Sequence, residues 1–323
     1  MSFKDIKGQD SAIEFLKSSI GNDKVSHAYM FIGPAGVGKK STAINFAKAL
    51  NCLSLKDEEP CDSCAHCKKI DSVNHPDVLT FSPLKEDSGF SIDSVRAITK
   101  DIGLRPYEGR KKVYVLEGAD SMRHAAQNAL LKTLEEPPSD SVLILIVENI
   151  NAIFPTILSR SKRVRFFPLT SGVIENILID NYKLDKGKAS LLSRLSSGEL
   201  DKALKYNDED FFRKRERIID GLKEGALLDS DLDGLSRSEL RMALDIMLTW
   251  YRDILVTKAG LDTPSALVNV DRMDLIRDEA KRSSFEGLNN IINQVILTGS
   301  FLEQNANPKL AMGVLGLSIA HKA

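Results

Sequence analysis

The glycine-rich stretch GPAGVGKKS, residues 33–41, constrains the fold of this chain more than any other feature of the sequence. It follows a short apolar run, Tyr29–Ile32, and leads into residues 41–51, whose apolar side chains recur with the spacing of a helix. A glycine loop between a strand and a helix directs backbone N–H groups and the positive end of the helix dipole toward one point. The stretch therefore predicts a strand, a phosphate-binding loop and a helix, with a plain tight turn as the alternative reason for the glycines.

The loop matches the nucleotide-binding P-loop pattern except at one position. The pattern requires Gly, four residues, Gly, Lys and then Ser or Thr, whose hydroxyl helps to hold magnesium. Here Lys40 stands in the hydroxyl position, and Ser41 follows one residue later as a partial substitute. The candidate nucleotide-binding residues of the loop are Gly33, Gly36, Gly38, Lys39, Lys40 and Ser41.

A P-loop ATPase also needs carboxylates at the end of a neighbouring strand, one for magnesium and one to activate water. The expected strand 113–116 runs into Glu117, the candidate metal ligand, and then Gly118, which has no group to polarise water. Asp120 is expected to cap the helix that follows. Defects in two separate elements predict weak or absent ATP hydrolysis and make magnesium doubtful, whereas the binding of ATP or ADP stays open.

Apolar strands alternate with helices through the first half of the chain, which predicts a parallel sheet covered on both faces. The expected strands span residues 29–32, 77–83, 111–119, 141–149 and 163–169. The expected helices among them span residues 41–51, 91–103 and 121–136. Beyond Pro168 only helical patterns occur, and long amphipathic ones dominate from about Glu209. The fold class is therefore α/β plus all-α, with an α/β domain over residues 1–168 and helical domains over 169–208 and 209–323.

The composition places few limits on partners. The formal net charge is -1, so no overall positive field favours nucleic acid, and any contact with DNA must come from a local patch. No apolar run approaches the length of a membrane span, and the start MSFKDIKGQD lacks the apolar core of a signal peptide. We therefore expect a cytoplasmic protein without a membrane partner.

All the cysteines fall within a short segment, at Cys52, Cys61, Cys64 and Cys67. The two short steps let neighbouring thiolates converge on one tetrahedral ion, and the eight-residue loop brings in the fourth. The spacing predicts a structural zinc module at about 52–67, with disulfides or free thiols as the alternative. His66 and His75 lie nearby; either could replace a cysteine, but we expect both to face solvent.

The sequence closely resembles the clamp-loader subunits of bacterial DNA polymerase III, members of the AAA+ family, over nearly its whole length. The resemblance rests on FKDIKGQD, SHAYMFIGPAGVGKK, the cysteine spacing, NALLKTLEEPP and PTILSRS. Within that family the delta-prime subunits, unlike the ATPase subunits, carry damaged loops of this kind. The resemblance implies an AAA+ core, a three-helix lid and a helical collar that serves oligomerisation. It implies as partners the gamma/tau-type ATPase subunits, the delta subunit, the sliding clamp and primed DNA.

The resemblance also implies a role for Arg160. The Ser-Arg-Ser sequence at 159–161 matches the family's Ser-Arg-Cys motif except at its last position, and in family members this arginine reaches ATP in the adjacent subunit. A guanidinium supplied in this way neutralises charge on the transferred phosphoryl group. Without the resemblance, Arg160 with Lys162, Arg163 and Arg165 would be interpreted as a solvated basic face.

Further positions are interpreted through the same resemblance. Val147 stands where the family usually has a polar phosphate sensor, and Asp201 where ATPase subunits have an arginine that touches the nucleotide. Taken alone, they would be a buried strand residue and a helix-surface acid. Arg96, at the start of the helix over 91–103, matches an arginine that holds DNA phosphates, although alone it is a plain surface charge. Trp250 is expected in a packing stripe for the collar or in the core of a helical bundle.

Two functions are most consistent with these features, and a nucleotide-gated DNA-binding module that acts alone is a third, more distant one. The first is a delta-prime subunit that helps to load the clamp during replication, hydrolyses little or no ATP and lends Arg160 to a neighbour. The second is a hydrolysing clamp-loader subunit in which Glu117 holds magnesium with help from Ser41. Either would be a component of a DNA-directed DNA polymerase holoenzyme, and the sequence leaves open whether this chain is itself an enzyme.

Overall fold

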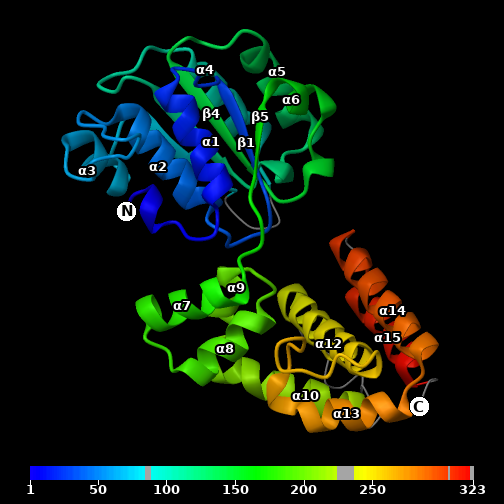
Figure 1. Ribbon diagram of the computed structural model, residues 1–323. Coiled ribbons are helices and arrows are strands. Elements are labelled where there is room, and N and C mark those ends of the chain that lie inside the picture. Colours follow the sequence, from blue (N-terminus) through cyan, green and yellow to red (C-terminus); the bar gives the residue numbers. More distant parts are fainter. Residues whose placement is uncertain (84–88, 224–235, 305, 321–323) are drawn as a thin grey trace. The chain divides into compact units, whose positions relative to one another are not determined.

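The computed structural model describes residues 1–83, 89–223, 236–304 and 306–320. The chain forms two compact units, Met1–Val173 and Ile174–Ala323 (Figure 1). The first holds the sheet, and the described part of the second is helical.

A five-stranded parallel sheet forms the centre of the first unit. Its strands are β1 (Ala28–Ile32), β2 (Val78–Phe81), β3 (Lys112–Glu117), β4 (Ser141–Val147) and β5 (Lys162–Arg165). Every strand expected from the apolar runs is confirmed. The spatial order is β2-β3-β4-β1-β5, so β4 lies between the strand that enters the glycine loop and the strand that ends at Glu117. Because the strands are parallel, their carboxyl ends share one edge of the sheet, the usual place for a ligand in such sheets.

Alternate strand residues pack on opposite faces of the sheet, and each face has its own core. Tyr29 and Phe31 contribute to the core under α1 (Asp10–Gly21) and α2 (Lys39–Asn51). Met30 lies on the other face, in the core under α4, α5 and α6. These three helices span Ile92–Ile102, His124–Glu135 and Pro155–Arg160. Burial of both faces explains why the strands are continuous apolar runs in the sequence.

Short elements complete the first unit. They are α3 (Ala65–Asp71) and the 3-10 helices η1 (Phe3–Asp5), η2 (Ala119–Ser121) and η3 (Ile150–Ala152). The helix α4 begins after Ser91, whose side chain accepts a hydrogen bond from the Ser94 N–H. Such caps satisfy N–H groups that the first helical turn leaves unpaired.

The second unit is built from helices. They are α7 (Ser171–Tyr182, which begins in the first unit), α8 (Lys186–Leu195), α9 (Leu200–Lys205), α10 (Glu209–Lys223), α12 (Arg237–Lys258), η4 (Val270–Arg272), α13 (Met273–Arg282), α14 (Phe285–Glu303) and α15 (Pro308–Ala320). The helix α12 packs against α10, α13 and α14. Trp250 of α12 is buried, so it belongs to the core of this bundle.

The expected fold class, an α/β core followed by helices, is confirmed by these elements. The division of the helical part into a domain over 169–208 and another over 209–323 stays a prediction, and residues 224–235, 305 and 321–323 of it lie outside the described residues. None of the helices described is both long enough and apolar enough to span a bilayer.

Candidate nucleotide and metal sites

The glycine loop connects β1 to α2 in a conformation that requires glycine at three positions. A Cβ atom on Gly33 would lie 2.5 Å from the backbone oxygen of Phe166, closer than real contacts allow. Gly36 and Gly38 have φ angles of +66° and +96°, in the region that disfavours other residues. The loop is therefore a tight, glycine-dependent turn at the carboxyl edge of the sheet, and phosphate binding by it stays a prediction.

The P-loop lysine, Lys39, is folded against this loop. It is buried at the start of α2, and its ammonium donates hydrogen bonds to the backbone oxygens of Gly33 and Pro34. The loop thus carries a fixed positive charge beside its backbone N–H groups.

The next residue, Lys40, is paired with the candidate metal ligand. Its ammonium lies 2.7 Å from Oε2 of Glu117, to which the hydroxyl of Ser82 also donates at 3.0 Å. The sequence did not reveal this contact, since it joins residues on α2 and β3 that lie 77 positions apart. The ammonium of Lys40 has no lone pair to bind a metal, and it is hydrogen-bonded to the carboxylate of Glu117 that a metal would need as a ligand. These residues do not fit magnesium.

The remaining parts of the expected ATPase centre also depart from an active arrangement. Gly118 has φ +70°, so a side chain there would be strained, and no carboxylate stands beside Glu117 in that position. Ser41 is half-buried in the first turn of α2, where the neighbouring Thr42 hydroxyl donates to Gly38 O. Whether Ser41 assists a metal stays a prediction.

The expectation that Asp120 caps the following helix is wrong. Its carboxylate accepts hydrogen bonds from the backbone N–H groups of Glu148 and Asn149, at 3.1 and 2.8 Å. The short helix η2 carries Asp120 toward the end of β4, and α5 begins only after Arg123. Asp120 therefore joins the carboxyl ends of β3 and β4.

Arg160 is the last residue of α6 and is about one-third exposed. Its guanidinium donates to Thr156 O at 3.0 Å and forms an ion pair with Oε1 of Glu135 at 3.0 Å. Both partners keep contact with water, with 36% of the Arg160 side chain and 52% of the Glu135 side chain exposed. An ion pair of this kind contributes about 0–1 kcal/mol, so it does not lock the arginine in place.

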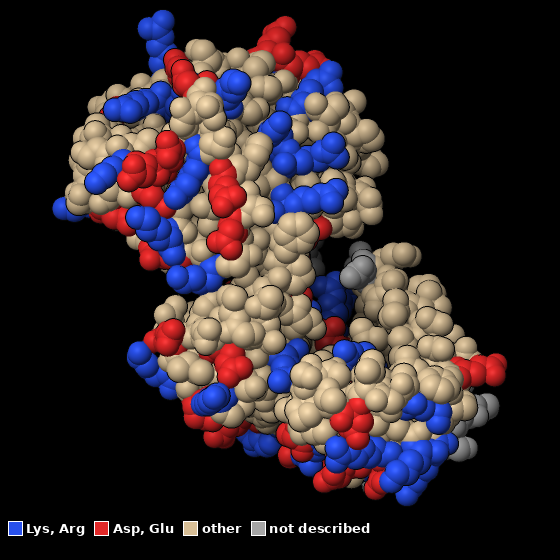
Figure 2. All heavy atoms as spheres, in the orientation of Figure 1, with Lys and Arg blue, Asp and Glu red and all other residues tan. Residues whose placement is uncertain are grey.

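The basic residues that follow Arg160 lie on β5, an edge strand of the sheet. Lys162, Arg163 and Arg165 are exposed, and Figure 2 shows Lys and Arg side chains gathered on this part of the first unit. Charged side chains on an edge strand discourage pairing with other strands. These three residues are therefore explained by the edge alone.

Three other predicted positions lie apart from these groups. Val147 is fully buried at the end of β4, beside Ile32 of β1. Asp201 is exposed in the first turn of α9. Arg96 is exposed on α4, 3.7 Å from the carboxylate of Asp93. The roles proposed for these residues stay predictions.

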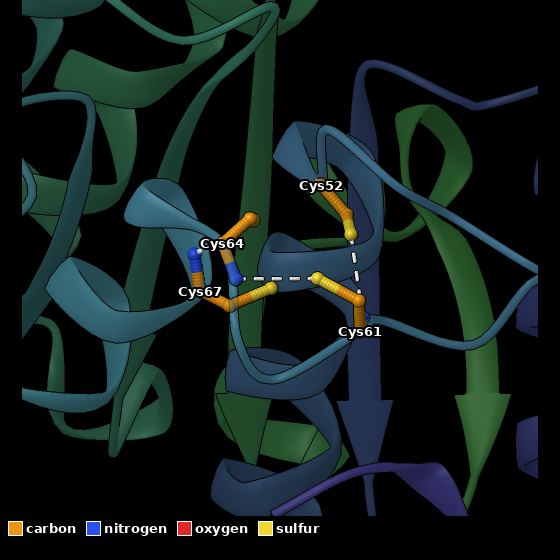
Figure 3. Close-up of side chains that lie close together, drawn as sticks. All are labelled: Cys52, Cys61, Cys64 and Cys67. Atoms are coloured by element: carbon orange, nitrogen blue, oxygen red, sulfur yellow. Dashed lines mark hydrogen bonds between the residues drawn. The ribbon is translucent and has the colours of Figure 1, made fainter.

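The cysteines gather into one cluster, as their spacing predicts (Figure 3). The sulfur atoms of Cys52, Cys61, Cys64 and Cys67 all lie within 4.8 Å of one another, and no two are joined in a disulfide. Cys52 follows α2, while the others lie in the turn before α3 or in its first residues. Backbone N–H groups of Cys61 and Cys64 donate to the sulfurs of Cys52 and Cys61, both at 3.3 Å. The donor set and its convergence fit one tetrahedral metal ion.

The cysteine thiols differ in acidity. Hydrogen bonds from the Ser63 side chain and backbone, together with the Cys64 N–H, lower the pKa of Cys61 to about 6. Burial raises the pKa of Cys67. The lowered pKa favours the thiolate of Cys61, the form that binds metal, whereas a metal must displace the proton of Cys67.

Buried Lys48 anchors this cluster to α2. Its ammonium pairs with Asp62, between two of the cysteines, and with Asp71 of α3 at 2.9 Å. Burial alone would lower the pKa of Lys48, but these two carboxylates outweigh it and the pKa is raised. Sequence reasoning missed this residue, because a lysine in a helix ordinarily faces water.

The expectation that His75 faces solvent is wrong, since it is buried. His75 and His66, with Glu108, form a second group of possible metal ligands. The hydrogen bonds of His75 instead indicate a structural histidine pair. Nδ1 of His75 accepts from the Asp77 N–H at 3.1 Å, so Nε2 carries the proton and donates to Nδ1 of His66 at 2.7 Å. A histidine bound to metal normally donates through its other nitrogen, which His75 cannot do.

Comparison with known proteins places the chain in a family. The family model described as "DNA polymerase III, delta subunit" matches residues 8–170, and "DNA polymerase III, delta subunit, C terminal" matches residues 210–315. The chain is 31% identical over 311 residues to DNA polymerase III subunit delta' of Bacillus subtilis, covering 93% of this chain and 92% of that protein. The chain belongs to the DNA polymerase III delta-prime subunits.

Further relatives include other subunits of DNA polymerase III. DNA polymerase III subunit tau of Bacillus subtilis is 30% identical over 309 residues, covering 93% of this chain and 54% of that protein. Subunit delta' of Pseudomonas aeruginosa is 29% identical over 235 residues, covering 72% of this chain and 71% of that protein. A gamma subunit-related protein from Thermotoga maritima has a similar solved structure, with 18% identity and a TM-score of 0.45, covering 96% of this chain and 99% of that one.

Proposed function

We propose that this chain is the delta-prime subunit of a bacterial clamp loader, which helps to load the sliding clamp onto primed DNA without hydrolysing ATP itself. Its family supports this role, and we expect gamma/tau-type ATPase subunits and a delta subunit as its partners in the cytoplasm. The observation that carries the proposal is the Lys40–Glu117 ion pair, because it neutralises the carboxylate that a hydrolysing subunit needs for its metal.

Arg160 supplies the catalytic contribution in this proposal. A guanidinium at the end of α6 can pair with the phosphates of ATP held by the next subunit, since only a weak, solvated ion pair with Glu135 has to be exchanged. Charge that develops on the transferred phosphoryl group is then neutralised from outside the ATPase subunit.

Zinc is the metal that we propose for the cysteine cluster. Four thiolates in tetrahedral reach leave no open position for a reaction, so the ion would be structural. Binding of zinc to such sites provides about 10 kcal/mol toward folding in small modules. The ion would hold the polar segment 52–67 in place against α2.

Two surfaces complete the proposal. Arg96, with the N-terminal turn of α4, is the candidate contact for DNA phosphates.

The helices α14 and α15 expose apolar side chains, and Figure 2 shows a largely uncharged surface over them. We assign this surface to the collar, where the subunits of a clamp loader associate.

A hydrolysing subunit is the second candidate. Glu117 would then have to leave both Lys40 and Ser82 to hold magnesium, and another group would have to activate water. The geometry supports this candidate less than the first.

Arg160→Ala in the reconstituted clamp loader tests the proposal, with Arg163→Ala as the matched control because it removes an exposed positive charge from the neighbouring strand. We expect Arg160→Ala to lower ATP turnover at the adjacent site about a thousandfold and to abolish clamp loading that depends on it. Arg163→Ala should leave both near the wild-type level.

The isolated chain supplies the complementary measurement. We expect negligible steady-state ATP turnover. Turnover typical of AAA+ enzymes that disappears in Lys39→Ala would contradict the proposal, and so would equal effects of Arg160→Ala and Arg163→Ala.

A further inference from the structure

Lys40 and Glu117 form a link across the carboxyl edge of the sheet. Glu117 ends β3, Lys40 lies in the first turn of α2, and β4 separates β3 from β1 in the sheet. The ammonium nevertheless reaches the carboxylate at 2.7 Å. The Ser82 hydroxyl, after β2, binds the same oxygen at 3.0 Å. Three elements therefore converge on the position that a magnesium ligand occupies in an active P-loop.

The charges around the Glu117 carboxylate favour the ammonium of Lys40 over a divalent metal ion as its partner. A metal at Glu117 would displace the Lys40 ammonium and would then lie near that charge, the Lys39 ammonium and the N-terminus of α2, all of which are positive. The carboxylate would also lose its hydrogen bonds with Lys40 and Ser82. Lys40 itself lies at the position where the P-loop motif has the Ser or Thr whose hydroxyl also binds magnesium.

We infer that Lys40 takes the place of the magnesium ion, so that this P-loop binds a nucleoside triphosphate or diphosphate free of divalent metal. The inference rests on the proposed function, in which this chain does not itself hydrolyse ATP. Lys39 supplies one positive charge beside the loop N–H groups. The Lys40 ammonium, whose charge is paired with Glu117, is held beside them as a hydrogen-bond donor for the phosphates where the metal would lie. A polyphosphate bound there has no metal-bound arrangement for hydrolysis.

Nucleotide titrations of the full chain test this inference, with ATP as the probe and either excess EDTA or excess Mg²⁺ in the buffer. The decisive variant is Lys40→Thr, which restores the hydroxyl of the motif and frees Glu117. The double variant Lys40→Thr/Glu117→Gln removes the metal ligand again. Lys281→Thr is the matched control, because it breaks a surface ion pair, with Asp278 at 3.0 Å, on a different element.

The wild-type chain should bind ATP at least about tenfold more weakly with excess Mg²⁺ than with EDTA, because Mg²⁺ binds ATP in solution and withdraws the metal-free form that this site takes. Lys40→Thr should bind ATP at least about tenfold more tightly with Mg²⁺ than with EDTA, and the double variant should lose this difference. In electron paramagnetic resonance, a protein-bound Mn²⁺ signal distinct from that of Mn–ATP in solution should appear with ATP and Lys40→Thr only. Lys281→Thr should behave like the wild type.

Several results would overturn the inference. They are an ATP affinity of the wild-type chain that does not fall with excess Mg²⁺, no ATP binding by the wild-type chain in either buffer, and no gain in affinity with Mg²⁺ for folded Lys40→Thr. The last result would reduce the Lys40–Glu117 contact to a surface ion pair. Because all these titrations use the isolated chain, they leave the role of Arg160 in the assembled loader to its own test.

Discussion

At the scale of single residues, a buried carboxylate accepts hydrogen bonds from backbone N–H groups of a loop that would otherwise have no acceptor. Asp77 is buried, and its carboxylate accepts hydrogen bonds from the N–H groups of Tyr107, Glu108 and Gly109, at 2.7, 2.8 and 2.7 Å. Burial alone would raise the pKa of Asp77, but these donors outweigh it and the pKa is lowered. The ionised carboxylate therefore stabilises the loop that leads into β3.

Asp77→Asn should lower the free energy of unfolding at pH 7 by about 1–3 kcal/mol, because an amide offers one acceptor oxygen and leaves N–H groups unpaired. Since the folded-state pKa is depressed, this stabilisation is complete above the unfolded-state pKa of about 4 and is lost as pH falls through the folded-state value. The difference between variant and wild type should shrink as the pH falls below about 4.

Urea unfolding at neutral and acid pH measures this difference. Asp140→Asn, which changes an exposed carboxylate 3.4 Å from Lys111, serves as the control at each pH. A gap between Asp77→Asn and wild type that does not depend on pH would show that the charge of Asp77 is not what stabilises the loop.

At the scale of elements, the sequence predicted each strand because buried parallel strands are continuous apolar runs, as Ser141–Val147 illustrates. It predicted the cysteine cluster because the ligand spacing is local. It could not predict the strand order, which depends on pairing between distant segments. The Lys40–Glu117 contact depends on that order, and the true partners of Asp120 lie at the end of β4. The sequence did not predict the burial of Lys48, because a lysine in a helix is ordinarily expected on its exposed face.

The cysteine module should depend on its metal. Elemental analysis should find one zinc ion per chain, and a strong chelator should open the segment 52–71 to protease before the rest of the first unit, because four thiols cannot replace the ion. Cys61→Ser should behave like the chelated protein, while Ser72→Ala, an exposed change after α3, should not. A metal-free chain with unchanged protease resistance would exclude a structural ion.

In the second unit, Asp253 of α12 connects a buried polar network. Its carboxylate accepts from the N–H groups of Val268 and Asn269, and Asn269 in turn accepts from Arg215 of α10 at 2.8 Å. Asp253→Ala should lower the free energy of unfolding by about 3 kcal/mol, since it leaves the buried N–H groups of Val268 and Asn269 without their acceptor. Chemical denaturation measures the loss.

Asp278→Ala is the matched control for Asp253→Ala. It removes an exposed carboxylate of α13 that pairs with Lys281, and it should change stability by less than about 0.5 kcal/mol. Equal losses in the two variants would mean that the buried network does not hold α10 and α12 together.

At the scale of the whole molecule, the described parts of the chain carry charge and apolar surface in different places. The first unit has an exposed basic strand, whereas α14 and α15 of the second expose a row of apolar side chains. These are Ile296, Leu297, Phe301, Leu310, Val314 and Leu317. Exposed apolar surface of this kind favours association with other subunits. We therefore assign assembly with other subunits to the second unit, and the arginine supplied to a neighbouring ATP site, Arg160, to the first.

Leu310→Asp/Val314→Asp should block assembly with gamma/tau-type and delta subunits without unfolding the chain. Both side chains are exposed, at 70% and 53%, so aspartate meets water in the free chain but would be buried without a partner in the assembly. Sedimentation of the mixed subunits should show loss of the complex, and thermal unfolding of the isolated variant should match the wild type. Leu261→Asp, at a position 59% exposed elsewhere in the unit, should assemble normally. Full assembly by the double variant would place the interface on another surface.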